Sequence, residues 1–379
     1  MLYLHVPFCR SRCIYCDFYS TTAASLQDAF LQAVDREIAE RADYLPSRAL
    51  STIYIGGGTP STLGPARLER LFAAVLSRFT LLPQAEVTLE ANPDDITPAF
   101  ADALRSLPVN RLSLGVQTFD DALLRFLRRR HDARRAIEAV NTLSRAGFSN
   151  ISIDLIYSLP GQSIDLFMRD LDQAFALPIT HLSAYALSYS PATPLHRLRS
   201  RGIVTPASDE LCEQMYFALL DRADRAGFDH YEISSFARPS FHSRHNSGYW
   251  TGRPYLGLGP SACSYNLSSR RRNNPDLRLY TTQTAFSEEQ LTPTDLCNEI
   301  IMTRLRTREG LPIPEFTRRF GSTATDLLLR AAEPHIAAGR LQLSSDHLRL
   351  TRQALFVSDG IIADLFTTGS EEGGERSEE

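Results

Sequence analysis

The sequence predicts an α/β protein that has a mainly parallel sheet, followed by a smaller α/β domain. Two observations favour this fold class. Over the first 205 residues, short β-rich runs alternate with amphipathic helical stretches, and such alternation is typical of parallel sheets. The length of 379 residues also exceeds the usual size of one compact domain, which favours one large domain and one small domain.

Six strands and six crossover helices are expected in the large domain, residues 1–205, from their hydrophobic periods. The expected strands cover residues 2–6, 52–55, 86–89, 111–114, 151–155 and 181–187. The expected helices cover residues 26–42, 65–78, 98–106, 120–127, 133–146 and 163–175. Six units are too few for a complete eight-stranded barrel, so the periods leave an open partial barrel and a doubly wound sheet as alternatives. In both folds the functional residues lie on loops after the carboxyl ends of the strands.

The remaining chain is expected to form three parts. Residues 206–290 extend the large domain with a helix at 209–226, a strand at 230–233 and a polar, loop-rich stretch through 274. Residues 291–368 are expected to form the small domain, with helices at 293–305 and 314–320 and short strands at 341–343 and 348–350. This pattern is similar to a winged helix. Residues 369–379 are mostly Gly, Ser and Glu, and we expect this tail to be disordered.

Composition and charge are ordinary for a folded protein and argue against some classes of function. Hydrophobic residues make up 43% and charged residues 22%, unlike a disordered or membrane-spanning protein. The net charge of -4 argues against a general nucleic-acid binder. The three arginines at 270–272 are interpreted as a solvated loop, with contact to an anionic partner or lipid head group as the alternative. No export signal or spanning apolar stretch is visible, so we expect a cytoplasmic, reducing location, and peripheral membrane contact stays open.

Three of the six cysteines lie close together near the amino terminus: Cys9, Cys13 and Cys16. Three thiolates on one short loop suit iron in a cubane cluster whose fourth iron keeps an open position. Such an iron can chelate the amino and carboxylate groups of S-adenosylmethionine (SAM). The alternative is a zinc site with a distant fourth ligand, for which His5 and Asp17 are the nearest candidates. The other cysteines are scattered and are interpreted as core thiols: Cys212, Cys263 and Cys297.

A glycine-rich loop, Gly56-Gly57-Gly58-Thr59-Pro60, follows the second expected strand. Three glycines let backbone groups approach a ligand with no Cβ in the way. Alone, the loop is also compatible with a tight turn between a strand and a helix. Its position after a strand, like that of the cysteine loop, favours a ligand site.

The cysteine spacing and the glycine loop together resemble the radical SAM superfamily. Further runs at 3–9, 89–93, 113–119, 154–162 and 181–185 resemble the oxygen-independent coproporphyrinogen III dehydrogenase group. The resemblance extends over nearly the whole chain. It implies a partial (β/α)6 radical SAM barrel with a small carboxy-terminal, winged-helix-like α/β domain. It also implies a [4Fe-4S] cluster and SAM as cofactors.

The resemblance assigns roles to individual residues. It implies that the cluster is held by the three cysteines and that SAM is lined by Tyr3, Gly57, Gly58, Thr59 and Glu90. It places further residues around the cofactor pocket: Tyr15, Gln117, Arg129 and Asp154. Without the resemblance, a surface role would be the simpler interpretation of Arg129, which lies within a run of three arginines. Some of these residues hold a second SAM in the dehydrogenase, and for this chain that point stays open.

Two features distinguish the chain from the dehydrogenases. Those enzymes carry a further cysteine two residues after the third ligand, where this chain has Phe18, and they have an extension before the cluster motif. The run His245-Asn246-Ser247-Gly248-Tyr249-Trp250 resembles the His-Asn-x-x-Tyr-Trp signature of the HemW haem chaperones. This resemblance implies haem as a ligand and haem-acceptor proteins as partners, with membrane respiratory proteins among the candidates.

His245 is the first candidate for an axial haem ligand, because imidazole binds haem iron well and aromatic neighbours can pack on a porphyrin. The alternative is a hydrogen-bonded structural histidine in a core with Tyr249 and Trp250. His242 is interpreted as a surface-loop residue. The expected function is therefore a haem chaperone whose cluster and SAM control transfer. The alternative is oxidative decarboxylation of coproporphyrinogen III by a 5'-deoxyadenosyl radical. A radical SAM modifier of a macromolecule would need a substrate motif, and none is visible.

Overall fold

The computed structural model describes residues 1–367, and the chain divides into two compact units. The first unit consists of Met1–Gly248 and Arg253–Glu289. The second consists of Tyr249–Gly252 and the chain from Gln290 onward. The tail predicted to be disordered, 369–379, lies outside the described residues. No helix within residues 1–367 combines the length and the apolar character that a membrane crossing needs.

The first unit is built on a nine-stranded sheet with the strand order β7-β8-β6-β5-β4-β3-β2-β1-β9. Its parallel strands follow one another in chain order: β1 (Leu2–Val6), β2 (Ala49–Gly57), β3 (Thr80–Ala91), β4 (Arg111–Gln117), β5 (Ile151–Tyr157) and β6 (His181–Ala186). Because this order shows no reversal, the sheet has no topological switch point, and a doubly wound fold is excluded. The end strands β7 and β9 do not pair, so the predicted open partial barrel is confirmed.

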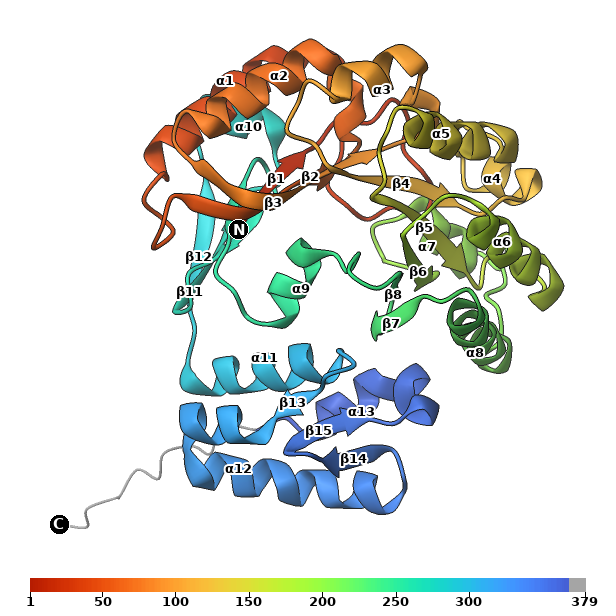
Figure 1. The fold of residues 1–379 in the computed structure, drawn as a ribbon, viewed down its shortest axis with the longest axis vertical. Coiled ribbons are helices and arrows are strands. Elements are labelled where there is room, and N and C mark those ends of the chain that lie inside the picture. The colour runs from red at the N-terminus through yellow and green to blue at the C-terminus, as the bar shows by residue number, and fades with distance from the viewer. Residues whose placement is uncertain (368–379) are drawn as a thin grey trace. The chain divides into compact units, whose positions relative to one another are not determined.

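Crossover helices lie along the outer side of these strands (Figure 1). They are α1 (Gln27–Glu40), α2 (Gly64–Leu76), α3 (Pro98–Leu104), α4 (Asp121–Phe126), α5 (Ala133–Arg145) and α6 (Ile164–Ala176). Capping side chains explain where several of them begin, since Asp120, Asp132 and Ser163 each accept a hydrogen bond from a backbone N–H of the first turn. The six helices lie within about two residues of the expected bounds.

The two faces of β4 show how the sheet creates a polar interior. Leu112, Leu114 and Val116 are fully buried and alternate with residues that line a cavity: Arg111, Ser113, Gly115 and Gln117. Successive strand side chains point to opposite faces, so the apolar set packs under the helices and the polar set faces into the barrel. The interior of this barrel is therefore built to hold a ligand.

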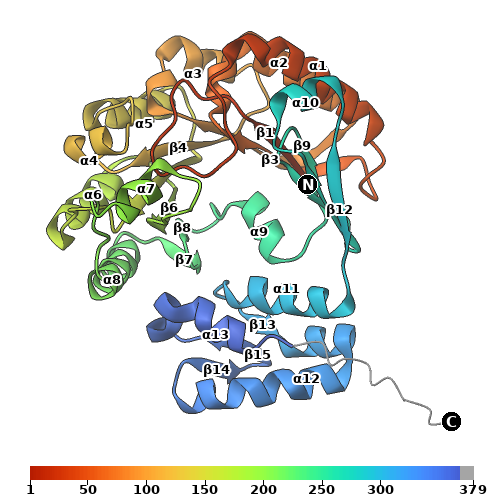
Figure 2. The ribbon, with the colours of Figure 1, turned by 180° about the vertical axis from the view of Figure 1, so that it is seen from behind.

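The remainder of the first unit extends the sheet at both edges. Strands β7 (Asp229–Glu232) and β8 (Ser235–Ala237) continue the sheet antiparallel beyond β6, and β9 (Leu256–Leu258) pairs parallel with β1. Helices α7 (Pro194–Ser200), α8 (Asp209–Arg225) and α9 (Arg244–Trp250) accompany them. Seen from behind, α10 (Leu277–Thr282) lies beside α1 (Figure 2).

The expectation of a loop-rich stretch through 274 is wrong. This stretch contains α9 and β9, and a second sheet is formed by β10 (Cys263–Tyr265), β11 (Ser269–Asn273) and β12 (Phe286–Gln290). The three arginines interpreted as a solvated loop belong to β11, where Arg271 lies 3.5 Å above the ring of Phe286. Strands of three to five residues are too short to show a hydrophobic period.

The second unit has its own fold and core. It contains α11 (Pro293–Leu305), β13 (Leu311–Pro312), α12 (Ile313–Ala337), β14 (Leu341–Ser344), β15 (His347–Leu350) and α13 (Ser358–Asp364). The strands form an antiparallel sheet in the order β13-β15-β14, and its core includes Ile301, Leu305 and Leu348. The helix expected at 314–320 ends where predicted, because Gly321, at φ 87°, is not helical; a second helical segment follows the kink, and the two together are labelled α12.

Candidate functional site

The carboxyl ends of the parallel strands surround a cavity of about 440 Å³, a volume suited to one ligand of ordinary cofactor size. Most of the predicted site residues line it: Cys9, Cys13, Tyr15, Cys16, Gly57, Gly58, Thr59, Glu90, Gln117, Arg129 and Asp154. Two predicted residues, Tyr3 and His245, are not part of this lining. Residues up to 145 positions apart in the chain, from Cys9 to Asp154, therefore line one cavity, as expected for residues that follow the ends of parallel strands.

The cysteine loop follows β1 and is tied down at both ends. The backbone N–H of Cys9 donates to the carbonyl of Thr21 at 2.9 Å, and Thr21 N–H donates back to Pro7 at 2.7 Å. In the middle of the loop, the carbonyl of Ile14 accepts from Leu195 N–H at 2.9 Å. Ile14 itself is buried in an apolar cluster. These anchors hold the three free, half-buried thiols along one side of the cavity.

Burial changes the acidity of these thiols. It raises the pKa of Cys16 to about 11 and also raises the pKa of Cys9, although hydrogen bonding to Thr59 opposes the shift at Cys9. Thiols of this kind become thiolates when a metal replaces their protons. Three soft donors on one loop fit the irons of a cluster that leaves one iron open.

The zinc alternative needs a fourth ligand, and both candidates are engaged elsewhere. His5 Nδ1 lies 3.1 Å from the hydroxyl of Tyr3, and its Nε2 lies 2.8 Å from the carbonyl of Tyr19. The Asp17 carboxylate accepts a hydrogen bond from Ser190 at 2.7 Å. Within residues 1–367, no three or more His, Cys, Asp or Glu side chains are arranged around a single ion position. The geometry thus favours ligands for separate irons over a zinc site.

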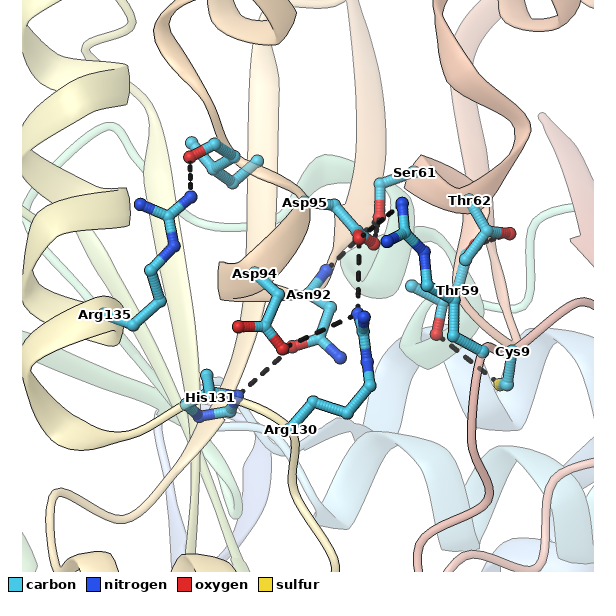
Figure 3. A network of polar contacts seen from close by, with 12 residues as sticks. Cys9, Thr59, Ser61, Thr62, Asn92, Asp94, Asp95, Arg130, His131 and Arg135 are labelled. Atoms are coloured by element: carbon cyan, nitrogen blue, oxygen red, sulfur yellow. Dashed lines mark hydrogen bonds and ion pairs between the residues drawn. The ribbon is translucent and has the colours of Figure 1, made fainter.

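The glycine loop packs directly against the cysteine loop. Gly58 N–H donates to Val6 at 2.8 Å, and Thr59 N–H donates to Phe8 at 2.7 Å. A Cβ at Gly58 would lie 2.8 Å from the carbonyl oxygen of Phe8, and Gly57 has a φ of 106°. Here the glycines are required for contact between the two loops, in addition to any contact with a ligand. Thr59 Oγ1 also lies 3.5 Å from Cys9 Sγ (Figure 3).

Glu90 lies near the end of β3 and fixes the base of the glycine loop. Its two carboxylate oxygens accept from the hydroxyl of Tyr54 at 2.6 Å and from Gly57 N–H at 3.1 Å. Burial raises the pKa of Glu90 to about 7, against the opposing effect of these hydrogen bonds. Glu90 therefore fixes the backbone of Gly57 through this hydrogen bond.

Arg129 connects the cysteine loop to two strand ends. Its Nη1 donates to Cys13 Sγ at 3.4 Å, and its Nη2 donates to the carbonyl of Gly115 at 2.5 Å and to Asn92 Oδ1 at 3.3 Å. Its Nε has no protein partner. The arrangement directs a guanidinium, a good partner for anions, to a ligand thiolate and into the cavity.

Gln117, Asp154 and Tyr15 complete the predicted set. Gln117 ends β4 with a φ of 73°, a left-handed conformation that is rare for a residue with a side chain and that often marks a functional site. Asp154 accepts from Ser113 Oγ at 3.4 Å, and burial raises its pKa to about 6. The ring of Tyr15 packs against two small apolar clusters at the cavity wall.

A polar network beside the cavity holds the loop after β3 (Figure 3). Arg130 forms ion pairs with Asp95 at 3.2 Å and with Asp94 at 3.6 Å. Asp95 also accepts from Ser61 Oγ at 2.7 Å, and Arg10 of the cysteine loop lies 3.3 Å from it. Both arginines line the cavity, but Arg129 contacts the thiol of Cys13, whereas Arg130 is paired with the carboxylates of the loop after β3.

His245 and Tyr3 lie behind the cavity wall. His245 is fully buried, its Nδ1 lies 2.8 Å from the hydroxyl of Thr52, and its ring packs on Tyr54 at 5.2 Å. Burial lowers the pKa of His245 to about 3. Glu86 accepts the backbone N–H of His245 at 2.9 Å and so holds the start of α9. In this arrangement the imidazole has the environment of a structural histidine.

The lining also contains residues that were not among the predicted site residues, and Arg111, Ser113 and Asn246 are three of them. Arg111 begins β4 instead of following it, so the strand-end rule does not select it. Ser113 could have been found from the alternation of β4, which places it on the same face as Gln117. Asn246 enters the cavity from α9, whose position no sequence pattern indicated.

Family models match both parts of the chain. The model of the radical SAM superfamily matches residues 3–174, and the model of the HemN C-terminal domain matches residues 291–357. Radical SAM proteins use a [4Fe-4S] cluster and SAM, in agreement with the cysteine loop and the glycine loop described above. These cofactors are therefore those of the family.

Known proteins resemble the chain over nearly its full length. Heme chaperone HemW from Mycobacterium tuberculosis is 36% identical over 374 residues, which cover 96% of this chain and 94% of that protein. Heme chaperone HemW from Escherichia coli is 33% identical, with 95% and 96% covered. The solved structure of coproporphyrinogen III oxidase (HemN) from Escherichia coli has a TM-score of 0.84 at 24% identity, covering 97% of this chain and 89% of that one, which shows a shared fold. The chain belongs to the HemW family of heme chaperones within the radical SAM superfamily.

Proposed function

We propose that this protein binds haem and passes it to acceptor proteins, and that its cluster and SAM control the transfer. The observation that carries the proposal is the identity of 36% with a heme chaperone over 96% of the chain. The acceptors would be haem proteins, with membrane respiratory proteins among the candidates. The competing function is the oxidation of coproporphyrinogen III, the reaction of an enzyme that has the same fold.

The chain's residues fit the two cofactors of the family. The proposal assigns the cluster to Cys9, Cys13 and Cys16. It assigns SAM to the glycine loop, with Glu90 orienting the loop and Arg129, Gln117 and Asp154 lining the pocket. The cluster, when bound, would supply electron-transfer chemistry at the sulfonium of SAM. The residues of the lining would position the ligand.

Phe18 supports the chaperone function over the dehydrogenase function. It stands where the dehydrogenases carry a further cysteine, it lines the cavity, and 64% of its surface is exposed. An exposed aromatic ring is a suitable surface for the flat, apolar face of a porphyrin. The substitution therefore removes a thiol and adds a contact surface at one position.

The haem ligand is tested by titration. His245 remains the predicted ligand, although its burial and its contact with Thr52 would require α9 to move before iron could reach the ring. Haem is added to the wild type, to His245→Ala and to the control His347→Ala, and the Soret band is recorded. If His245 is the ligand, only His245→Ala changes the spectrum and the affinity. An unchanged spectrum in this variant removes His245 from the site.

Transfer and turnover are tested separately. Haem-loaded protein is mixed with apomyoglobin as a probe acceptor, and the proposal predicts that the haem spectrum moves to myoglobin faster than haem is released without an acceptor. In a second, anaerobic assay the reconstituted protein receives SAM, a reductant and coproporphyrinogen III. The proposal predicts no protoporphyrinogen. Turnover comparable to that of an authentic dehydrogenase would contradict it.

A further inference from the structure

Arg111 is a buried charge that forms no ion pair within residues 1–367. Only 2% of its surface is exposed, and it is among the largest fully buried side chains. Its side chain lines the cavity, its Nε has no hydrogen-bond partner, and no ion pair joins it to a carboxylate within residues 1–367. A buried charge without a partner is strongly unfavourable, so this position calls for an anion that the chain itself does not supply.

The two nearest carboxylates are engaged by other groups. Glu90 accepts from Tyr54 at 2.6 Å and from Gly57 N–H at 3.1 Å. Asp154 accepts from Ser113 at 3.4 Å and also interacts with Ser183. The charge of Arg111 is close enough to lower the pKa of both carboxyls, but neither approaches the guanidinium as an ion pair. The hydrogen bonds of these carboxylates thus leave Arg111 without a direct ion pair.

Other unsatisfied polar groups lie near Arg111. Thr88 is its neighbour across the strand pair, is fully buried, and has a hydroxyl without a partner. The side-chain amide of Asn246 lines the same cavity from α9, and only its backbone N–H is hydrogen-bonded, to Ser243. Arg111 is close enough to α9 to lower the pKa of His245. The first turn of α9 and the start of β4 therefore place two potential donors, Asn246 and Arg111, in the cavity lining, and the hydroxyl of Thr88 lies on β3 beside Arg111.

This group lies at the end of the cavity opposite the cysteines. Arg111 begins β4, six residues before Gln117, which corresponds to roughly 20 Å of strand. The cysteine loop follows the carboxyl end of β1, and the strands from β1 to β6 run parallel. An anion at Arg111 is therefore separate from the group that meets the cluster.

We propose that Arg111, assisted by Asn246, binds a carboxylate of a ligand at the floor of the cavity. A planar guanidinium matches a carboxylate with two parallel hydrogen bonds. A doubly charged phosphate fits less well, because Glu90 and Asp154 line the same space. The single carboxylate of SAM is taken by the open iron of the cluster, whereas haem carries two propionates, so haem is the ligand with the required chemistry. The inference rests on the haem binding of the proposed function and does not require that haem is transferred.

The test compares haem with a form that lacks the free carboxylates. Reconstituted wild type and Arg111→Met are titrated anaerobically with haem, haem dimethyl ester and SAM. Arg111→Met should weaken the binding of haem by about 10-fold or more and leave the binding of the dimethyl ester and of SAM unaffected. An equal loss with the dimethyl ester would contradict a carboxylate contact. If the variant binds all three ligands as the wild type does, the proposal is wrong.

Thermal unfolding without ligand separates binding from a structural role. Arg41 is a matched control, since it is equally buried but is paired with Glu37 at 2.9 Å and bonded to Ser264 at 2.8 Å. Arg41→Met should lower the Tm, whereas Arg111→Met should leave it unchanged or raise it, because it removes an unpaired charge. An equal loss of Tm in both variants would overturn the proposal. If Arg111→Met does not fold, Arg111→Lys keeps the charge and should weaken the same ligand to a smaller extent.

The two proposals fail in different ways. A protein that does not pass haem to apomyoglobin but distinguishes carboxylates through Arg111 contradicts the chaperone function alone. A protein that transfers haem and shows no effect of Arg111→Met contradicts the carboxylate subsite alone.

Discussion

Glu90 is a site residue whose burial lowers the free energy of unfolding as the pH rises. Burial raises its pKa from 4.5 to about 7, so the folded protein binds a proton here more readily than the unfolded chain between these values. Stability rises with pH only where the unfolded state binds more protons, and here the sign is the opposite. The contribution of Glu90 therefore makes the free energy of unfolding fall as the pH rises from about 4.5 to 7, by roughly 3 kcal/mol in all.

The prediction is that Glu90→Gln reduces the decline of Tm between pH 5 and 7. The measurement is thermal unfolding of the cluster-free protein at several pH values. Glu40→Gln is the control, since Glu40 is an exposed carboxyl at the end of α1 and its loss should leave the profile unchanged. A Glu90→Gln profile as steep as that of the wild type would show that burial of Glu90 is not the cause.

His245 gives a second prediction at this scale, on stability. His245→Ala removes a fully buried ring that packs on Tyr54 and contacts Thr52, so it should lower the free energy of unfolding by about 2 to 4 kcal/mol without haem. Denaturant unfolding of the haem-free protein measures this loss. His347→Ala, in the hairpin of the second unit, is expected to have a small effect. A wild-type midpoint for His245→Ala would mean that the ring does not support the fold.

Individual site residues differ in how well the sequence predicts them. Cysteine spacing and glycine runs depend on local chemistry, so the cysteine and glycine loops could be located in the chain. Arg111 could not, because its importance comes from the lack of partners in three dimensions. His245 could be noticed as part of a motif, but its burial against β2 depends on how α9 enters the barrel.

At the scale of elements, α1 is joined to the β9–β11 region by a buried polar network. Glu37 is fully buried, and its oxygens accept from Arg41 at 2.9 Å, Asn273 at 2.7 Å and Tyr280 at 2.6 Å. Gly259 N–H also donates to it at 2.9 Å. This one carboxylate organises the segments that complete the sheet beside β1.

Loss of this carboxylate should be costly for the first unit. Glu37→Ala leaves the buried guanidinium of Arg41 without its counter-ion, and we expect the free energy of unfolding to fall by about 3 to 5 kcal/mol. Chemical denaturation followed by far-UV circular dichroism measures the change. Asp28→Ala removes an exposed ion pair with Arg67 and should cost far less, so an equal loss in both variants would contradict the role of burial.

The elements also show where sequence patterns stop being informative. The six βα units could be predicted because long strands and helices display several hydrophobic repeats. β8, β9 and β10 each have three residues, and their pairing is decided by neighbours distant in the chain. The helix end before Gly321 was predicted correctly, whereas the second helical segment that follows it, up to Ala337, was not predicted.

At the scale of the whole molecule, cofactor binding and folding should be linked in the first unit. The three cysteines lie on one loop, so a cluster held by all three would link different points of that loop in the folded state. All lining residues of the cavity belong to the first unit, and the second unit has a separate hydrophobic core. A ligand that binds only the folded state stabilises the unit that holds it.

Removal of the cluster should therefore change protection from hydrogen exchange in one unit and not in the other. In the cluster-free protein, we expect faster exchange in β1, in β2 and in the loop between Val6 and Thr21, because these segments hold the cysteine and glycine loops together. The amides of α11 and of β15, which pack in the second core, should exchange at the same rate with and without the cluster. The variant with serine at Cys9, Cys13 and Cys16 is the matched control, since it should show the cluster-free pattern even after reconstitution. Equal loss of protection in both units would mean that the cluster stabilises the chain as a single cooperative body.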